Sequence, residues 1–285
     1  MDNGCLGGAA IGPMDYPHTI QIETSGACNA TCTFCPHSTM NRTAQQRMSD
    51  SMFKGAIDEL ESWDVKPHYI CPFLTNEPFL DNRIYDLCSY VNLKLPGSNL
   101  VFFTNGSLFT EQNLLRLGAV KNISAVYVSL HHSNAKDYEL ELGLKWSKTL
   151  EAIHYLIAHC KTYKIKPVIL RVQDGDIEKD RAFIEFCKGE FHGTQVQLSY
   201  RYNWKGDIGS SFWFEISDTP CPRHSSLCVL WDGRVALCCL DQNGDYSLGK
   251  FPENTLLNIY NGETAKKYRT QSRRLSVPCN RCNMR

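Results

Sequence analysis

The chain lacks long apolar runs, and charge of neither sign accumulates along it. No stretch reaches the roughly 18 apolar residues of a membrane-spanning helix, and the N-terminus lacks the basic and apolar regions of a secretory signal. These absences predict a cytoplasmic protein with no membrane partner. The 30 basic and 30 acidic side chains balance, and no basic segment stands out for a nucleic-acid backbone, so no nucleic-acid partner is expected.

Cysteine, by contrast, is abundant, with 14 among the 285 residues. In a reducing compartment thiols serve metals or catalysis rather than disulfides. Three of them fall in the segment Cys28-Asn29-Ala30-Thr31-Cys32-Thr33-Phe34-Cys35, at spacings of four and three. Three thiolates can hold three corners of a cubane 4Fe–4S cluster and leave the fourth iron without a protein ligand. Such an open position is typical of a catalytic rather than a structural metal site.

Two other interpretations of this trio stay open, a zinc site and a buried group of cysteines. Zinc normally takes four ligands, and no fourth ligand lies nearby in the sequence. Cysteine is also frequent in protein cores, but Asn29 and Thr31 interrupt any apolar face here.

The first 200 residues alternate between strand and helix patterns. Alternating and apolar segments predict six strands, at 19–23, 68–74, 100–103, 125–130, 167–172 and 196–200. Helical spacing predicts helices at 52–63, 84–93, 111–117, 147–160 and 177–187, with Thr110 as an N-cap. This alternation predicts an α/β fold with a parallel sheet, which right-handed crossovers curl into a partial (β/α)6 TIM-like barrel.

The pattern changes after residue 202. Residues 203–220 are rich in Gly, Ser, Asp and aromatics and are expected to bridge two domains, 17–215 and 216–285. Asp232-Gly233 between two apolar segments predicts a β-hairpin. A helix is predicted over about 256–269, so the second domain is expected to be a small hairpin plus helix.

The spacing C-x3-C-x-aromatic-C, read here from Cys28 to Cys35, resembles the signature of radical S-adenosylmethionine (SAM) enzymes. The resemblance implies a 4Fe–4S cluster on Cys28, Cys32 and Cys35 whose open iron binds the amino and carboxylate groups of SAM. An electron then cleaves SAM to a 5′-deoxyadenosyl radical, and the partial barrel is the fold that this family uses. A flavodoxin or ferredoxin is the implied electron donor.

The C-terminal cysteines resemble a second motif of the same family. Cys221 and Cys238 follow C-x11-G-x4-C through Gly233, and Cys279 and Cys282 form C-x2-C. This is similar to the extension called SPASM, or Twitch in its short form, and implies one auxiliary 4Fe–4S cluster on these four cysteines. Two 4Fe–4S clusters and SAM are therefore the implied cofactors.

Two points about the second group stay open. Four cysteines with a C-x2-C also describe a structural zinc site. Cys228 or Cys239 could replace Cys221 or Cys238 as a ligand, although the count from Gly233 favours Cys238 and leaves Cys239 free. Cysteines 5, 71, 88, 160 and 187 lack ligand spacing and are expected to be structural.

The resemblance also places SAM at the C-terminal ends of the strands, where barrel sites are built. Phe34 is expected near the adenine. Thr75-Asn76-Glu77-Pro78 takes the place of the Gly-Gly-Glu or Gly-Glu-Pro segment that binds the SAM amino group, with Asn76 replacing a glycine. Arg171 is expected to pair with the SAM carboxylate.

Asn105 and Ser129, at the ends of the third and fourth strands, complete the expected SAM contacts. Each of these positions also suits an ordinary polar residue in a loop, and Asn105-Gly106 suits a plain turn. His131 and His132 could serve as substrate bases or be ordinary histidines.

Relatives with this layout include enzymes that dehydrogenate aminocyclitols and, more loosely, aminoglycoside epimerases and peptide-modifying enzymes of natural-product biosynthesis. The resemblance implies an oxidoreductase or epimerase that abstracts a hydrogen atom from a sugar or aminocyclitol. About 17 residues precede the first strand, too few for a leader-peptide-binding domain, so peptide modification is the second expectation. A non-catalytic protein with zinc in both sites is a third.

Cys239 has two interpretations of its own. It either packs as a small apolar group beside the auxiliary cluster, or it donates a hydrogen atom to a substrate radical. The second role is the one a cysteine is thought to play in radical SAM epimerases.

Overall fold

A single curved sheet organises the described residues, 15–210, 212 and 214–284 of the computed structural model. Its nine strands lie in the order β6-β5-β4-β3-β2-β1-β7-β8-β9. They are β1 (Thr19–Ile22), β2 (Tyr69–Cys71), β3 (Asn99–Thr104), β4 (Ile123–Ser129), β5 (Pro167–Gln173), β6 (Gln195–Tyr200), β7 (Ser226–Val229), β8 (Arg234–Ala236) and β9 (Gly249–Lys250). Cys5 lies outside the described residues.

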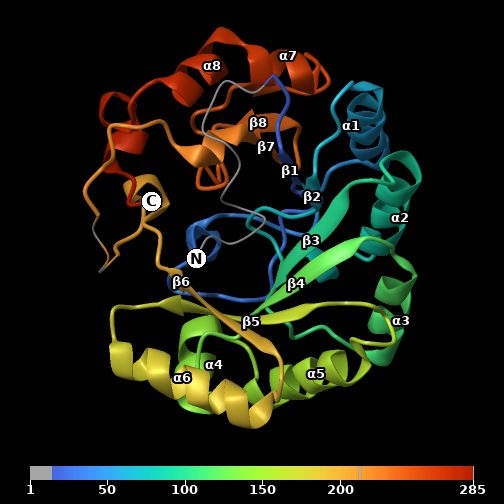
Figure 1. Ribbon diagram of the computed structural model, residues 1–285, viewed down its shortest axis with the longest axis vertical. Coiled ribbons are helices and arrows are strands. Elements are labelled where there is room, and N and C mark those ends of the chain that lie inside the picture. Colours follow the sequence, from blue (N-terminus) through green and yellow to red (C-terminus); the bar gives the residue numbers. More distant parts are fainter. Residues whose placement is uncertain (1–14, 211, 213, 285) are drawn as a thin grey trace.

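The six predicted strands are all present and pair in parallel as β1 to β6. Helices cover the outside of this sheet, so that the strands curve around the middle of the molecule (Figure 1). This arrangement confirms the α/β partial barrel. It also brings the C-terminal strand ends to one rim, where βα loops build sites.

The helices follow the strands in sequence order. They are α1 (Asp50–Ser62), α2 (Ile84–Lys94), α3 (Glu111–Ala119), α4 (Ala135–Leu142), α5 (Trp146–His159), α6 (Ile177–Glu190), α7 (Leu256–Asn261) and α8 (Glu263–Thr270). Thr110 caps α3 as predicted, since its hydroxyl accepts a hydrogen bond from the Asn113 amide at 3.3 Å. Helix α4 was not predicted. The single helix predicted over 256–269 was wrong, because the extended backbone of Gly262 separates α7 from α8.

The predicted hairpin forms as β7 and β8, with Cys228 opposite Ala236. Its turn needs glycine, because Gly233 has φ +85° and a Cβ there would lie 2.2 Å from the Phe251 carbonyl oxygen. Strand β7 pairs in parallel with β1, so the hairpin extends the barrel sheet. The boundary near residue 215 stays a prediction, since the strands on its two sides share one sheet.

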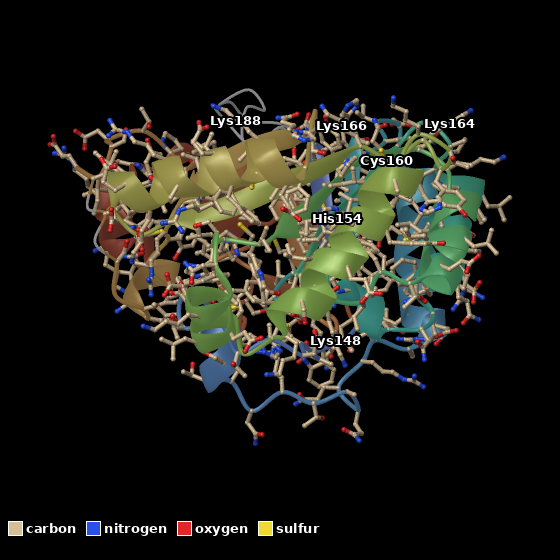
Figure 2. The ribbon with its side chains drawn as sticks, turned by 90° about the horizontal axis from the view of Figure 1, so that it is seen from below. Lys148, His154, Cys160, Lys164, Lys166 and Lys188 are labelled. Carbon is tan, nitrogen blue, oxygen red and sulfur yellow. The ribbon has the colours of Figure 1, made fainter. Side chains whose placement is uncertain are left out.

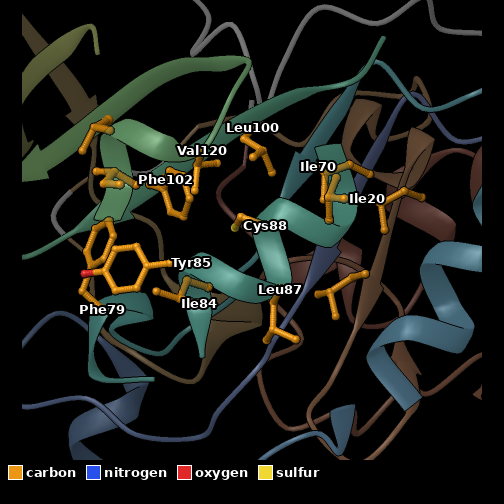
Figure 3. Packing of buried hydrophobic residues seen from close by; sticks show 14 of the residues in the cluster. Ile20, Ile70, Phe79, Ile84, Tyr85, Leu87, Cys88, Leu100, Phe102 and Val120 are labelled. Carbon is orange, nitrogen blue, oxygen red and sulfur yellow. The ribbon is translucent and has the colours of Figure 1, made fainter. Parts of the chain in front are cut away.

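The core lies between the sheet and its helices. Ile20, Ile70 and Leu100 from three neighbouring strands face α2, which contributes Leu87 and Cys88 (Figure 3). All five are at most 3% exposed. Cys88 therefore serves as a small apolar core residue, as expected of a cysteine without ligand spacing.

Replacing Phe102 tests how much this core contributes to stability. Its ring is fully buried and stacks on Phe79, with centroids 5.3 Å apart. We expect Phe102→Ala to lower the free energy of unfolding by about 3–5 kcal/mol, because it removes buried area and leaves a cavity. Leu93→Ala, on the outer face of α2 and 73% exposed, is the matched control and should change stability by less than about 0.5 kcal/mol. Urea titrations of both variants measure the difference; equal losses would contradict this account of the core.

Polar side chains lie along the outer faces of α5 and α6. Figure 2 shows Lys148, His154 and Cys160 along α5, with Lys188 on the neighbouring α6. The His154 ring joins the two helices through a 2.7 Å contact with Glu190. Cys160 thus lies on the outside of the barrel. None of the described helices combines the length and apolar character needed to cross a bilayer.

Candidate functional site

One cavity of about 250 Å³ lies at the rim of the barrel, and the three-cysteine segment lines it through Cys28, Cys32 and Cys35. Burial raises the pKa of the Cys28 thiol to about 12 and of Cys35 to about 11, and it raises the pKa of Cys32 as well. Thiols of this kind keep their protons at neutral pH until a metal displaces them. Their shared cavity and their thiol chemistry suit an iron–sulfur cluster.

Helix α4 holds the cysteine segment in place. The amides of Thr31 and Thr33 donate to the carbonyls of Leu142 and Glu141, at 2.9 and 3.2 Å. The Glu141 carboxylate also accepts a hydrogen bond from the Thr33 hydroxyl and lies 2.6 Å from the His132 ring. The hydrogen bond with His132 is the main cause that lowers the pKa of Glu141 to about 2. His132 is therefore bound to α4.

Gly143 allows α4 to end against the cysteine segment. Its φ is +69°, and a Cβ at this position would lie 2.2 Å from the Thr31 hydroxyl oxygen. We expect Gly143→Ala to lower the free energy of unfolding by about 1–3 kcal/mol through left-handed strain and this clash. The displaced Thr31 should also reduce iron retention at the neighbouring cysteines.

The matched control is Gly189→Ala, inside α6, where a Cβ would meet nothing within 4 Å. Because alanine favours helix, this variant should be as stable as the parent or more so. Urea titration and iron content after anaerobic reconstitution measure both variants. Equal stability and iron content in the two would contradict this role of Gly143.

A second set of cysteines lines a small neighbouring cavity: Cys221, Cys238, Cys279 and Cys282. They come from three places in the sequence. Cys221 precedes the turn before β7, Cys238 lies two residues after β8, and Cys279 and Cys282 lie near the end of the chain. Cys228 is not among them, since it is fully buried and its thiol donates to the Gln21 side-chain oxygen at 3.3 Å. Cys239 lines the larger cavity. The fold thus assembles the four cysteines that the spacing had selected.

No group of three or more His, Cys, Asp or Glu side chains in the described part of the chain is close enough to hold a single metal ion. The sulfur atoms of the cysteines that bind a cubane cluster are further apart than those around a single metal ion, because the cluster lies between them. The remaining expected structural cysteines, Cys71, Cys88 and Cys187, are buried in apolar clusters.

Phe34 lines the cavity, and its place near the adenine stays a prediction. The His131 ring meets it edge-on, with centroids 4.9 Å apart, and the Arg201 guanidinium lies over it at 5.6 Å. Burial lowers the pKa of His131 to about 3, and its Nδ1 accepts a hydrogen bond from the Val172 amide. His131 therefore helps to shape the wall around Phe34 as a neutral ring.

The segment after β2 brings Asn76 and Glu77 to the cavity. The Asn76 side-chain nitrogen is buried and has no hydrogen-bond partner within the described chain. Glu77 accepts hydrogen bonds from the Thr104 hydroxyl and the Asn105 amide, both at 2.8 Å, and so joins this segment to the end of β3. Burial raises the pKa of Glu77 to about 7. The unpaired Asn76 nitrogen is a donor that a polar ligand could use.

Asn105 and Ser129 also line the cavity. The Asn105 side chain donates to the Asn29 side-chain oxygen and accepts from the Ser107 amide and hydroxyl. It thereby forms a local turn that fixes the cysteine segment to the end of β3. Ser129 stands at the end of β4.

Arg171 is not among the residues that line the cavity. Its guanidinium donates to Asp180, Asp174 and the His131 carbonyl oxygen, at 2.5 to 3.0 Å. The neighbours Leu170 and Val172 line the cavity instead, because successive side chains of a strand point to opposite faces. The three partners use donors of Arg171 on the other face of β5, and its pairing with the SAM carboxylate stays a prediction.

Among the cavity residues that sequence reasoning missed are Arg201, Trp204 and Arg223, which follow the sixth strand. The Trp204 indole donates to the Phe34 carbonyl oxygen at 3.0 Å and so fixes the end of the cysteine segment. Position alone could have indicated Arg201 and Trp204, because they lie just beyond the C-terminal end of β6. Arg223 carries no such signal.

Two family models match the chain. The model described as the radical SAM superfamily matches residues 22–184, and the one described as an iron–sulfur cluster-binding domain, SPASM, matches residues 221–283. Proteins of the first family bind SAM and a 4Fe–4S cluster, and the second domain binds additional iron–sulfur clusters.

Two curated relatives are 26% identical. One is the S-adenosyl-L-methionine-dependent 2-deoxy-scyllo-inosamine dehydrogenase of Niallia circulans, aligned over 47% of this chain and 55% of the relative. The other is the mycofactocin maturase MftC of Mycolicibacterium smegmatis, aligned over 81% of this chain and 64% of the relative. The chain thus spans between half and two thirds of their lengths.

Solved structures share the fold. BtrN in complex with AdoMet and 2-DOIA has a TM-score of 0.66 and 20% identity, over 93% of this chain and 92% of that one. Streptococcus suis SuiB bound to precursor peptide SuiA has a TM-score of 0.70 and 15% identity, over 95% and 70%. With a matching model over more than half of its length, the chain belongs to the radical SAM superfamily and carries a SPASM-type iron–sulfur domain at residues 221–283.

Proposed function

We propose that the chain binds a 4Fe–4S cluster through Cys28, Cys32 and Cys35 and uses SAM to abstract a hydrogen atom from a small hydroxyl-bearing substrate. The observation that carries this proposal is the shared cavity, whose wall runs from these three thiols to Cys239 beside the second cysteine group. When bound, the cluster and SAM supply the 5′-deoxyadenosyl radical of this superfamily.

The chain's own residues orient SAM. Phe34 offers a ring face for the adenine, and the free Asn76 nitrogen donates a hydrogen bond to the amino-acid end. Glu77 and Asn105 keep the ends of β2 and β3 together, and Ser129 lines the wall at β4. The largely apolar remainder of the wall excludes water from the reacting atoms.

The second cluster is assigned to Cys221, Cys238, Cys279 and Cys282, which line one cavity. Four cysteine ligands leave no open iron, so a cluster held there supplies electron transfer rather than substrate binding. This suits an oxidation. An external flavodoxin or ferredoxin is the proposed donor, and the free thiols among the described cysteines fit a reducing cytoplasm.

The proposed substrate class is a sugar or aminocyclitol, with dehydrogenation or epimerisation as the reaction. The named dehydrogenase relative and the near-complete mutual coverage with BtrN support it. Peptide modification is the second candidate, and the likeness to SuiB bound to a precursor peptide supports it.

Two measurements test the proposal. Iron and sulfide analysis after anaerobic reconstitution should give about eight irons per chain, four per cubane. Zinc with negligible sulfide would support a non-catalytic zinc protein instead. Assays of 5′-deoxyadenosine with aminocyclitols and with peptides then separate the two substrate classes, and turnover with peptides only would exclude the sugar proposal.

A further inference from the structure

Three basic side chains line the small cavity of the second cysteine group: Lys205, Arg223 and Arg273. Each of them is at most 5% exposed. No carboxylate is among the described residues that line this cavity. A buried cation without a counterion is costly, because its charge has lost its hydration. An anionic group inside the cavity would offset this cost.

The three cations differ in their partners. The Lys205 ammonium pairs with Asp207 and lies 3.6 Å from the Asp245 carboxylate. By contrast, Nε and Nη1 of Arg223 and Nε of Arg273 have no hydrogen-bond partner in the described chain. Among the described residues that line the cavity, the two arginines are therefore the cations that lack a counterion.

The charges of both arginines act on the thiols of the second cysteine group. Burial raises the pKa of the Cys221 thiol to about 11, while the Arg223 amide and the charges of Arg273 and Arg223 oppose this rise. Burial also raises the pKa of Cys279 to about 12, against the charge of Arg273. Arg223 lines the large cavity as well, so it lies between the second cysteine group and the space proposed for the substrate.

We propose that Arg223 and Arg273 raise the reduction potential of the 4Fe–4S cluster assigned to the second cysteine group. Four thiolates outweigh the positive charge of an oxidised cubane, and reduction adds a further negative charge. Two buried cations beside the cluster therefore stabilise its reduced form more than its oxidised form. Net charge and hydrogen bonds to the sulfurs are known to set the potential of such clusters. The inference rests on the proposed function and names the residues that suit the second cluster to accept an electron.

The test is an anaerobic redox titration of the reconstituted full chain, followed by electron paramagnetic resonance. The variant with alanine at Cys28, Cys32 and Cys35 identifies the signal of the second cluster. Arg223→Gln and Arg273→Gln should each lower the equilibrium constant for reduction about 10- to 100-fold, because glutamine keeps N–H donors and loses the charge. This is a midpoint shift of about −60 to −120 mV, since tenfold is about 59 mV for one electron.

Two further variants separate charge from structure. Arg223→Lys should shift the midpoint by less than about 30 mV, or about threefold, because lysine keeps the positive charge. Arg274→Gln is the matched control, since the Arg274 side chain is 47% exposed and already pairs with Glu215 and Asp218. It should keep the potential of the parent chain, because solvent screens an exposed charge.

An unchanged potential in either glutamine variant, or a shift in Arg223→Lys or Arg274→Gln as large as that in Arg223→Gln, would overturn the proposal. Iron and sulfide are counted in every sample. If one glutamine variant loses the second cluster, the other decides. Loss from both would overturn the proposal, because the arginines would then be structural. A parent chain with zinc in place of the second cluster would overturn the proposed function too, whereas a cluster whose potential ignores both arginines overturns this inference alone.

Discussion

Replacing Cys28, Cys32 and Cys35 together by alanine is expected to abolish 5′-deoxyadenosine formation. The three thiols line the same cavity and are the proposed ligands of the cluster that cleaves SAM. Without them no iron faces the cofactor, so the loss should reach the detection limit, at least about a thousandfold. Iron should fall from about eight to about four per chain, because the second group keeps its own cluster.

The converse variant provides the control. Alanine at Cys279 and Cys282 removes two thiols from the second cavity and leaves the first cysteine segment intact. It should also fall to about four irons but keep slow, uncoupled SAM cleavage. If the first triple variant still formed 5′-deoxyadenosine, or lost all of its iron while folded, the assignment of the two groups would be wrong.

Cys239→Ala is expected to change the product of the reaction and to leave the rate of SAM cleavage unchanged. Cys239 lines the large cavity, where the substrate is proposed to bind, and lies outside the set of four cysteines around the second cavity. If its thiol donates a hydrogen atom to the substrate radical, turnover in deuterated water should place solvent deuterium in the product of the parent chain. The variant should lose this label almost completely and stall or yield an oxidised product.

Cys160→Ala is the matched control, because Cys160 lies at the end of α5 on the outer surface (Figure 2). It should keep parent turnover and labelling. Unchanged labelling in Cys239→Ala would remove this thiol from the mechanism and leave it as a packing residue. Parent product without solvent deuterium would favour dehydrogenation.

Strand and helix patterns predicted the barrel, and cysteine spacing predicted the cysteine segment. Both are short-range signals that a sequence shows directly. Helix α4 was missed because it has only eight residues, four of them charged, so the helical spacing of Ala135, Tyr138 and Leu142 is too short to stand out. The ends of α4 show the usual helix start and stop residues, since Asn134 is the N-cap and the left-handed Gly143 ends the helix. Without α4, the support of the cysteine segment could not be foreseen.

Two other features of the structure do not follow from residue spacing. Arg171 lies in a strand, as predicted, but spacing does not show which face of the strand its side chain takes, because a shift of one position reverses the face. Pairing of β7 with β1 joins segments about 200 residues apart, and nothing local indicates such a neighbour. The same long-range pairing places Arg223 and Cys239 on the cavity that Cys28 lines.

The most direct test is the electron paramagnetic resonance spectrum of the dithionite-reduced, reconstituted chain with and without SAM. SAM should bind the open iron of the cluster on Cys28, Cys32 and Cys35. It should therefore change the spectrum of the parent chain and of the variant lacking Cys279 and Cys282. The signal of the Cys28, Cys32 and Cys35 triple variant should not change. An iron-loaded, reduced parent chain whose spectrum is the same with saturating SAM would contradict the account.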